Sequence, residues 1–133
     1  MPNWLANTLR FILAAAVPVC LVLTNVRLMM TTAFVNLEYN VPGFPADPYG
    51  FTKEDRLQYS AIAVAYLLND AGIEFLGDLT LPPEKVVNND IGDRMYNDRE
   101  LKHMLDVKKV VRSVLGVWMV SVVLVIGSVA ALA

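Results

Sequence analysis

The sequence has little that could build a metal or disulfide framework, with one cysteine and one histidine in 133 residues. A lone Cys20 excludes an intramolecular disulfide and a thiolate metal site. Charge is also scarce: 18% of residues are charged and 56% are hydrophobic, whereas soluble domains carry about 25% charged and about 45–50% apolar residues. From Ser113 to Ala133 there is no charge at all. These deficits favour a protein embedded in lipid.

The charges that are present are concentrated in the middle of the chain. All thirteen acids lie between Glu38 and Asp106, and ten of the eleven Lys and Arg lie between Arg27 and Arg112. The formal net charge of −2 is therefore an average over two environments. No basic patch with interleaved aromatic residues is present, so we expect no nucleic-acid partner.

The first apolar run extends from Phe11 to Val26 and continues after Arg27. A bilayer core needs about 20 apolar residues, so we expect Arg27 to reach for the interface while the helix continues. Residues 8–35 are therefore predicted to be the first transmembrane helix and its extension. The three residues before Cys20 lack the small side chain of a lipoprotein cleavage site, which favours an uncleaved anchor.

The second apolar run extends from Val110 to Ala133, and Arg112 is its only charge. Residues 98–133 are predicted to form one long helix that enters a second membrane span. The run has no polar flank at Ala133, so the polypeptide either ends at the far membrane face or continues beyond it. The predicted fold class is an all-α membrane protein, in which two transmembrane helices flank an extramembrane segment of helices and loops.

Residues 36–97 form this polar segment. Prolines and glycines predict a loop over residues 36–51. Thr52, with Asp55 three residues later, predicts a capping box and a helix from about Lys53 to Asn69. Residues 61–68 of that helix are apolar on every side, so we expect them to be buried against protein or lipid.

A polar linker is predicted over residues 72–96, where Pro82 and Pro83 interrupt any helix. Asn97 with Glu100 then predicts a second helix start, at Asp98.

His103 is the best candidate for chemistry. On a helix, Glu100 and Asp106 lie three residues on either side of it, close enough for one carboxylate to hold the imidazole. His103 precedes the apolar run by seven residues, or about 10 Å of helix, which is the level of lipid head groups. A His held in this way suits general-base catalysis of acyl transfer, and the alternative is a solvated His on an amphipathic helix.

No metal site or cofactor is expected, because one His with scattered carboxylates has no ligand spacing. Membrane lipids are expected partners, since basic side chains close to the apolar run favour contact with head groups; these are Lys102, Lys108, Lys109 and Arg112.

Two segments resemble a known family, the lipoprotein intramolecular transacylases (Lit), which are bacterial integral membrane proteins. They are LEYNVPGFPADPYGFTKEDRLQY (residues 37–59) and NDRELKHMLDVKKVV (residues 97–111). The core from His103 to Lys108 is the most specific part. The resemblance covers the chain from Asn25 onward and corresponds to the front half of the family pattern.

The resemblance implies an enzyme of the bacterial cell membrane, with residues 36–109 on the extracytoplasmic side. Its substrate would be a lipoprotein, whose glyceryl-linked acyl chain moves to the α-amine of the lipidated cysteine. His103 corresponds to the first of two histidines that the family uses. The family has four membrane helices, whereas this sequence has two apolar runs and no second histidine.

A second interpretation remains open for the function. The chain could be a non-catalytic accessory subunit of two helices, bound to other subunits of a larger membrane complex such as a photosynthetic or respiratory one. The orientation is also open, because Arg and Lys before the second span place residues 36–109 in the cytoplasm by the positive-inside rule, which is weak for loops above about 60 residues.

Overall fold

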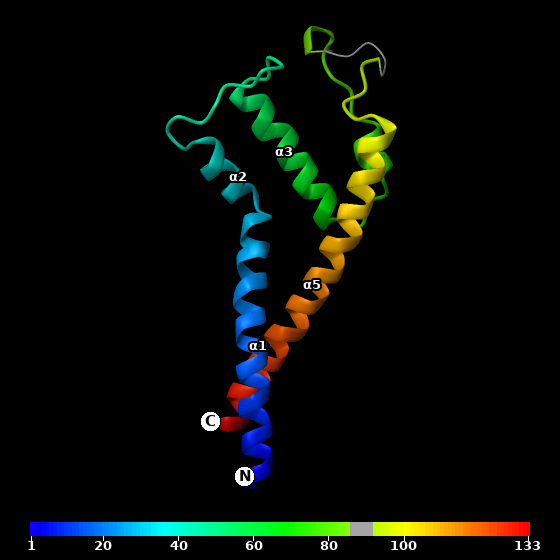
Figure 1. The fold of residues 1–133 in the computed structure, drawn as a ribbon. Coiled ribbons are helices and arrows are strands. Elements are labelled where there is room, and N and C mark those ends of the chain that lie inside the picture. The colour runs from blue at the N-terminus through cyan, green and yellow to red at the C-terminus, as the bar shows by residue number, and fades with distance from the viewer. Residues whose placement is uncertain (86–91) are drawn as a thin grey trace. The chain divides into compact units, whose positions relative to one another are not determined.

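A computed structural model describes residues 1–85 and 92–133. Of the described residues, 73% are helical, and these residues form no strand beyond an isolated bridge between Thr80 and Arg94. The helices, drawn in Figure 1, are α1 (Asn3–Met29), α2 (Thr32–Tyr39), α3 (Lys53–Leu68), α4 (Glu74–Gly77), the short 3-10 helix η1 (Pro83–Lys85) and α5 (Asp98–Leu132).

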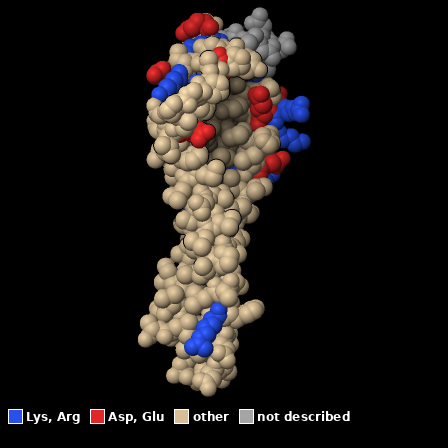
Figure 2. Space-filling model, turned by 60° about the vertical axis from the view of Figure 1, so that its left-hand side comes forward, with Lys and Arg blue, Asp and Glu red and all other residues tan. Residues whose placement is uncertain are grey.

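The chain divides into two units. The apolar unit contains Met1–Met29 and Ser113–Ala133, and the polar unit contains Met30–Arg112. Helices α1 and α5 are both long and apolar enough to cross a membrane. In the most apolar stretch of 18 residues, only 6% of α1 and 11% of α5 is buried. The core helix of a soluble protein would bury such residues, so these helices present their side chains to a surrounding medium (Figure 2). The predicted all-α fold class with two membrane-spanning helices is confirmed.

Small residues occupy the buried positions of the apolar unit. Ser121 and Ser128 are each 4% exposed, and Ala16 on α1 is 7% exposed. The indole Nε1 of Trp118 donates a hydrogen bond of 3.0 Å to Thr24 Oγ1 on α1. Small side chains allow helices to approach closely in lipid, where polar bonds between them add about 0.6 kcal/mol each. The two helices of the apolar unit are thus joined by small residues and a polar bond.

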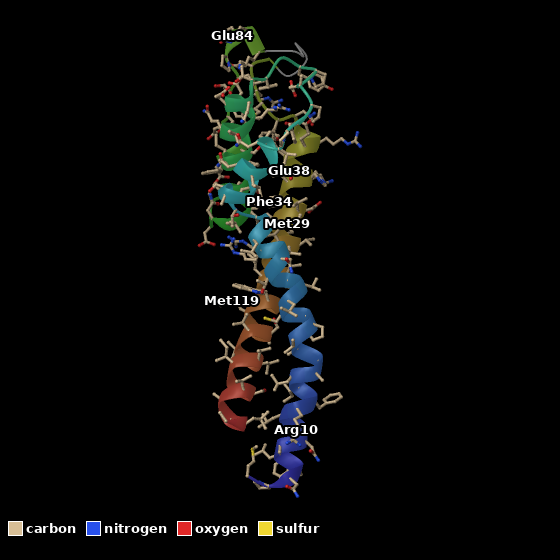
Figure 3. The ribbon with its side chains drawn as sticks, turned by 90° about the vertical axis from the view of Figure 1, so that its left-hand side faces the viewer. Arg10, Met29, Phe34, Glu38, Glu84 and Met119 are labelled. Atoms are coloured by element: carbon tan, nitrogen blue, oxygen red, sulfur yellow. The ribbon has the colours of Figure 1, made fainter. Side chains whose placement is uncertain are left out.

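The region predicted as one helix over residues 8–35 is divided in the structure. Helix α1 ends at Met29, and α2 begins at Thr32 (Figure 3, where Met29 and Phe34 are labelled). Thr31 has an extended backbone (φ −129°, ψ 148°), and its hydroxyl accepts a hydrogen bond from Phe34 N. Because this is the geometry of an N-cap, Thr31 starts a new helix. The predicted loop over residues 36–51 is wrong for its first four residues, which belong to α2.

Helix α3 begins with the predicted capping box. Thr52 Oγ1 accepts from Asp55 N, and the Asp55 carboxylate accepts from Thr52 N at 2.8 Å. Of the residues 61–68 that were expected to be buried, Tyr66 is fully buried, most others are half-buried, and Leu68 remains 37% exposed.

The predicted linker over residues 72–96 contains a short helix, α4, whose Leu76 is fully buried; residues 86–91 of that linker lie outside the described residues. The second predicted helix start is confirmed. Asn97 Oδ1 accepts from Glu100 N, and Glu100 Oε2 accepts from Asn97 N, both at 2.9 Å. Helix α5 therefore begins at Asp98 with a fixed orientation of its first turn.

Candidate functional site

His103 is exposed on the second turn of α5, within the polar unit. It borders a cavity of about 570 Å³, whose other lining residues are Tyr96, Asn97, Arg99, Glu100 and Met104. The ring makes no hydrogen bond or ion pair with any residue of the described ranges 1–85 and 92–133. The imidazole is therefore available to a ligand in this cavity.

The structure brings only one of the two predicted carboxylates to this cavity. Glu100 lines it together with His103, but its Oε2 accepts the Asn97 amide in the capping box. Asp106 does not line it, and Asp106 Oδ1 instead accepts from Lys109 Nζ at 3.0 Å. Helical spacing predicted that both acids lie near the ring, but each carboxylate accepts a hydrogen bond from another group: Glu100 from the Asn97 amide and Asp106 from the Lys109 ammonium. Neither carboxylate orients the imidazole in this structure.

A second cavity, of about 310 Å³, shares Tyr96 with the first and was not predicted from the sequence. Its basic residue is Arg56 on α3, whose guanidinium carbon lies 5.2 Å from the Tyr39 ring centre and 5.0 Å from that of Phe44. Arg56 Nη1 donates to the carbonyl of Pro45 at 3.1 Å. On the face drawn in Figure 2 the polar unit is visibly hollowed.

Arg56 is held by aromatic faces rather than by an acid. Among the described residues it forms no ion pair, and its buried Nε has no hydrogen-bond partner. Asp47 lines the same cavity, but its Oδ2 accepts the amides of Tyr49 and Phe51. Stacking between aromatic rings compensates part of the cost of burying a guanidinium. No local pattern in the sequence marks this arrangement, because the aromatic residues come from a loop and from α2.

Tyr96 forms part of the wall of both cavities. Burial raises the pKa of its hydroxyl above 10.0, and the nearby Glu100 carboxylate raises it further. The hydroxyl is therefore protonated at neutral pH and can donate a hydrogen bond to an oxygen in either cavity.

A basic cluster lies where α3 ends beside α5. Lys108 is only 6% exposed, and its Nζ donates to Asn69 Oδ1 at 3.1 Å and to the Ala71 carbonyl at 2.6 Å. The same ammonium lies 4.0 Å from the centre of the Tyr66 ring. Lys108 was expected to contact lipid head groups, but the structure uses it to fix the end of α3 and the following turn.

Arg112, one turn further along α5, reinforces this junction. Its Nη2 donates to the Asn69 carbonyl at 2.8 Å and to Asp70 Oδ1 at 2.5 Å. Asp70 is fully exposed, so the ion pair is screened by solvent and contributes little. The bond to the Asn69 carbonyl is more important for structure, since it satisfies a carbonyl at a helix end.

The described part of the chain has no group of three or more His, Cys, Asp and Glu that could hold a metal ion. The chemistry available at His103 is thus that of an imidazole, a protonated phenol and a carboxylate around a common cavity. Such a set can accept and return a proton and donate a hydrogen bond to a developing negative charge.

No protein-family model matches the chain, and no solved structure matches it. An uncharacterized protein of Aquifex aeolicus (strain VF5) is similar to it, with 32% identity over 85 residues. These residues are 64% of this chain and 36% of that protein, so the chain spans well under half the length of the relative that it matches.

Proposed function

We propose that the chain is the membrane-anchored part of an acyl-transfer enzyme of the lipoprotein intramolecular transacylase type, with His103 as its general base. The observation that carries this proposal is the imidazole at the edge of a cavity of about 570 Å³. Along α5 the ring is seven residues, or about 10 Å, from Val110, where the apolar run begins. This distance corresponds to the level of the lipid head groups.

The reaction moves one acyl chain within a single substrate. The α-amine of the lipidated cysteine attacks the ester carbonyl carbon, an amide bond forms, and the bond between that carbon and the glycerol oxygen breaks. His103 accepts the proton from the amine and returns it to the glycerol oxygen. Tyr96, which is held protonated, suits the stabilisation of the oxyanion.

We propose Glu100, rather than Asp106, as the carboxylate that acts with His103. Glu100 is now the better candidate for a partner of His103, since it lines the cavity and Asp106 does not. Glu100 has a second oxygen in addition to the one that caps α5. When the cavity is filled, that oxygen can accept a hydrogen bond from an N–H of the imidazole or of the substrate amine.

The family pattern uses two histidines, and this sequence contains one. A complete site of that type needs the second imidazole from outside these 133 residues or from a second copy of the chain. Two copies would supply two His103 rings to one site.

The test is a reconstituted reaction. The purified chain is placed in liposomes with a synthetic peptide that begins with diacylglyceryl-cysteine. Because the transfer leaves the mass unchanged, the readouts are loss of the free α-amine and tandem mass spectrometry of the acyl position. His103→Ala should lower the rate by about 10²–10⁴-fold, whereas Lys102→Ala, an exposed neighbour on α5 that does not line the cavity, should not. Equal rates for wild type and His103→Ala would contradict the proposal.

We place the chain in the bacterial cell membrane as a two-span protein, with residues 36–109 on the extracytoplasmic side. The substrate requires this side, although the basic residues near the second span favour the opposite orientation. The test uses Glu54→Cys in a Cys20→Ser background, because Glu54 is exposed on α3. A membrane-impermeant maleimide should label this cysteine in intact cells, and labelling only after lysis would contradict the orientation.

The accessory-subunit interpretation is supported by one observation, the exposed apolar surface of α1 and α5. Large side chains such as Phe11 (75% exposed), Met119 (62%) and Val123 (67%) have no intrachain cover. Lipid alone can cover them, as can another subunit. Co-purification with one stoichiometric membrane complex, together with no amine loss in the liposome assay, would favour this second function.

A further inference from the structure

The junction of α3 and α5 has a cavity of its own, separate from the one beside His103. Its volume is about 190 Å³, room for about six water molecules or one phosphate group. Three cations and one carboxylate line it, so the wall carries a net charge of +2; these are Lys108, Lys109, Arg112 and Asp70. Concentrated positive charge in a small concave space favours an anion.

A buried hydroxyl at the same cavity gives independent support. Tyr66 lines it, is 0% exposed, and its hydroxyl has no hydrogen-bond partner among the described residues. A buried polar atom without a partner costs about 1–3 kcal/mol, and a bound water or ion is one way in which such an atom is satisfied. Burial raises the pKa of the Tyr66 hydroxyl above 10.0, and the negative charge of Glu74 raises this pKa further. The hydroxyl is therefore protonated at neutral pH and can donate a hydrogen bond.

The sequence indicates where this cavity lies relative to lipid. Arg112 is the last charged residue before the uncharged run that starts at Ser113. Lipid phosphates lie just outside the hydrocarbon, where clustered Lys and Arg between helices bind anionic head groups. We therefore expect the donors that line this cavity to lie near the lipid phosphates; these donors are Tyr66, Lys108, Lys109 and Arg112.

We propose that this cavity binds the phosphate group of an anionic phospholipid, with the Tyr66 hydroxyl as one donor and Lys109 and Arg112 as the cationic ones. The bound lipid would fix the end of α3 to the membrane surface. This inference is independent of acyl transfer at His103.

The test titrates the detergent-solubilised full chain with dihexanoyl phosphatidylglycerol, dihexanoyl phosphatidylcholine and inorganic phosphate, and measures the rise in the melting temperature. Phosphatidylglycerol should bind at least about tenfold more tightly than the other two. Equal affinity for phosphatidylcholine, or for inorganic phosphate, would overturn the assignment to an anionic lipid.

Tyr66→Phe separates a binding role from a structural one. Without lipid, removal of an unpartnered buried hydroxyl should leave the melting temperature unchanged or raise it. With phosphatidylglycerol, the same variant should lose about tenfold in affinity, because a bond to a charged group is lost. Lys109→Gln should weaken phosphatidylglycerol binding as well, and Lys102→Gln, an exposed lysine outside the cavity, should not. Unchanged affinity in both Tyr66→Phe and Lys109→Gln would overturn the proposal.

Discussion

Replacement of Lys108 by methionine should release the end of α3 from α5. Methionine keeps the apolar stem but removes an ammonium that donates to Asn69 Oδ1 and the Ala71 carbonyl and lies over the Tyr66 ring. Two charged hydrogen bonds at about 1.5 kcal/mol each and a cation–π contact of about 1 kcal/mol give a gross loss of about 4 kcal/mol. Relief from desolvation of the ammonium offsets part of this, which leaves about 2–3 kcal/mol.

Hydrogen exchange measures this loss at the site itself. The Ala71 amide is bonded to Asn69 Oδ1 at 3.0 Å, so it reports on the turn that Lys108 holds. A loss of about 2–3 kcal/mol would make it exchange about 30- to 150-fold faster. Lys102→Met is the matched control, since Lys102 is exposed on the same helix. Wild-type exchange in Lys108→Met, or the same acceleration in both variants, would refute the reasoning.

Three further predictions concern other parts of the chain. Thr52→Ala should destabilise α3 by about 1 kcal/mol, because it removes the hydroxyl that accepts a hydrogen bond from Asp55 N. Thermal unfolding of the polar unit measures this loss, and an unchanged melting temperature would contradict it. Tyr96→Phe tests the raised pKa of Tyr96: the difference in free energy of unfolding between wild type and the variant should be constant below about pH 10 and should shift against wild type as the pH rises through the folded-state pKa. A shift against wild type on acidification would contradict it. Trp118→Phe should weaken the apolar unit by about 0.6 kcal/mol, measured by unfolding in mixed micelles, with Thr24→Val having the same effect and the double variant adding nothing more.

The features that could be predicted from the sequence are those that depend on neighbouring residues. The capping boxes at Thr52 and Asn97 are closed by side chains three residues away, so the local pattern contains the whole interaction. The two membrane-length helices follow from long uncharged runs. The break at Thr31 was missed because Thr31 and Thr32 lie in an otherwise apolar stretch that a continuing helix could also contain. Only the extended backbone of Thr31 reveals the cap.

The candidate site was only partly predictable, because its contacts join distant segments. His103 and Glu100 share a cavity as their spacing on a helix suggests, but spacing could not show that the Asn97 amide competes for Glu100. Lys108 and Asn69 are 39 residues apart, and no local pattern links them. The position of Arg56 between Tyr39 and Phe44 likewise depends on the path of a loop.

The central claim is that this chain moves an acyl chain onto an amine, and the product itself tests it most directly. A reporter lipoprotein is co-expressed with the chain in a bacterial host that has no other enzyme for N-acylation, and its N-terminal peptide is sequenced by tandem mass spectrometry. The account predicts an amide-linked acyl chain with one ester-linked chain remaining, and its loss in His103→Ala. A peptide that keeps both chains on glycerol and a free α-amine would contradict it.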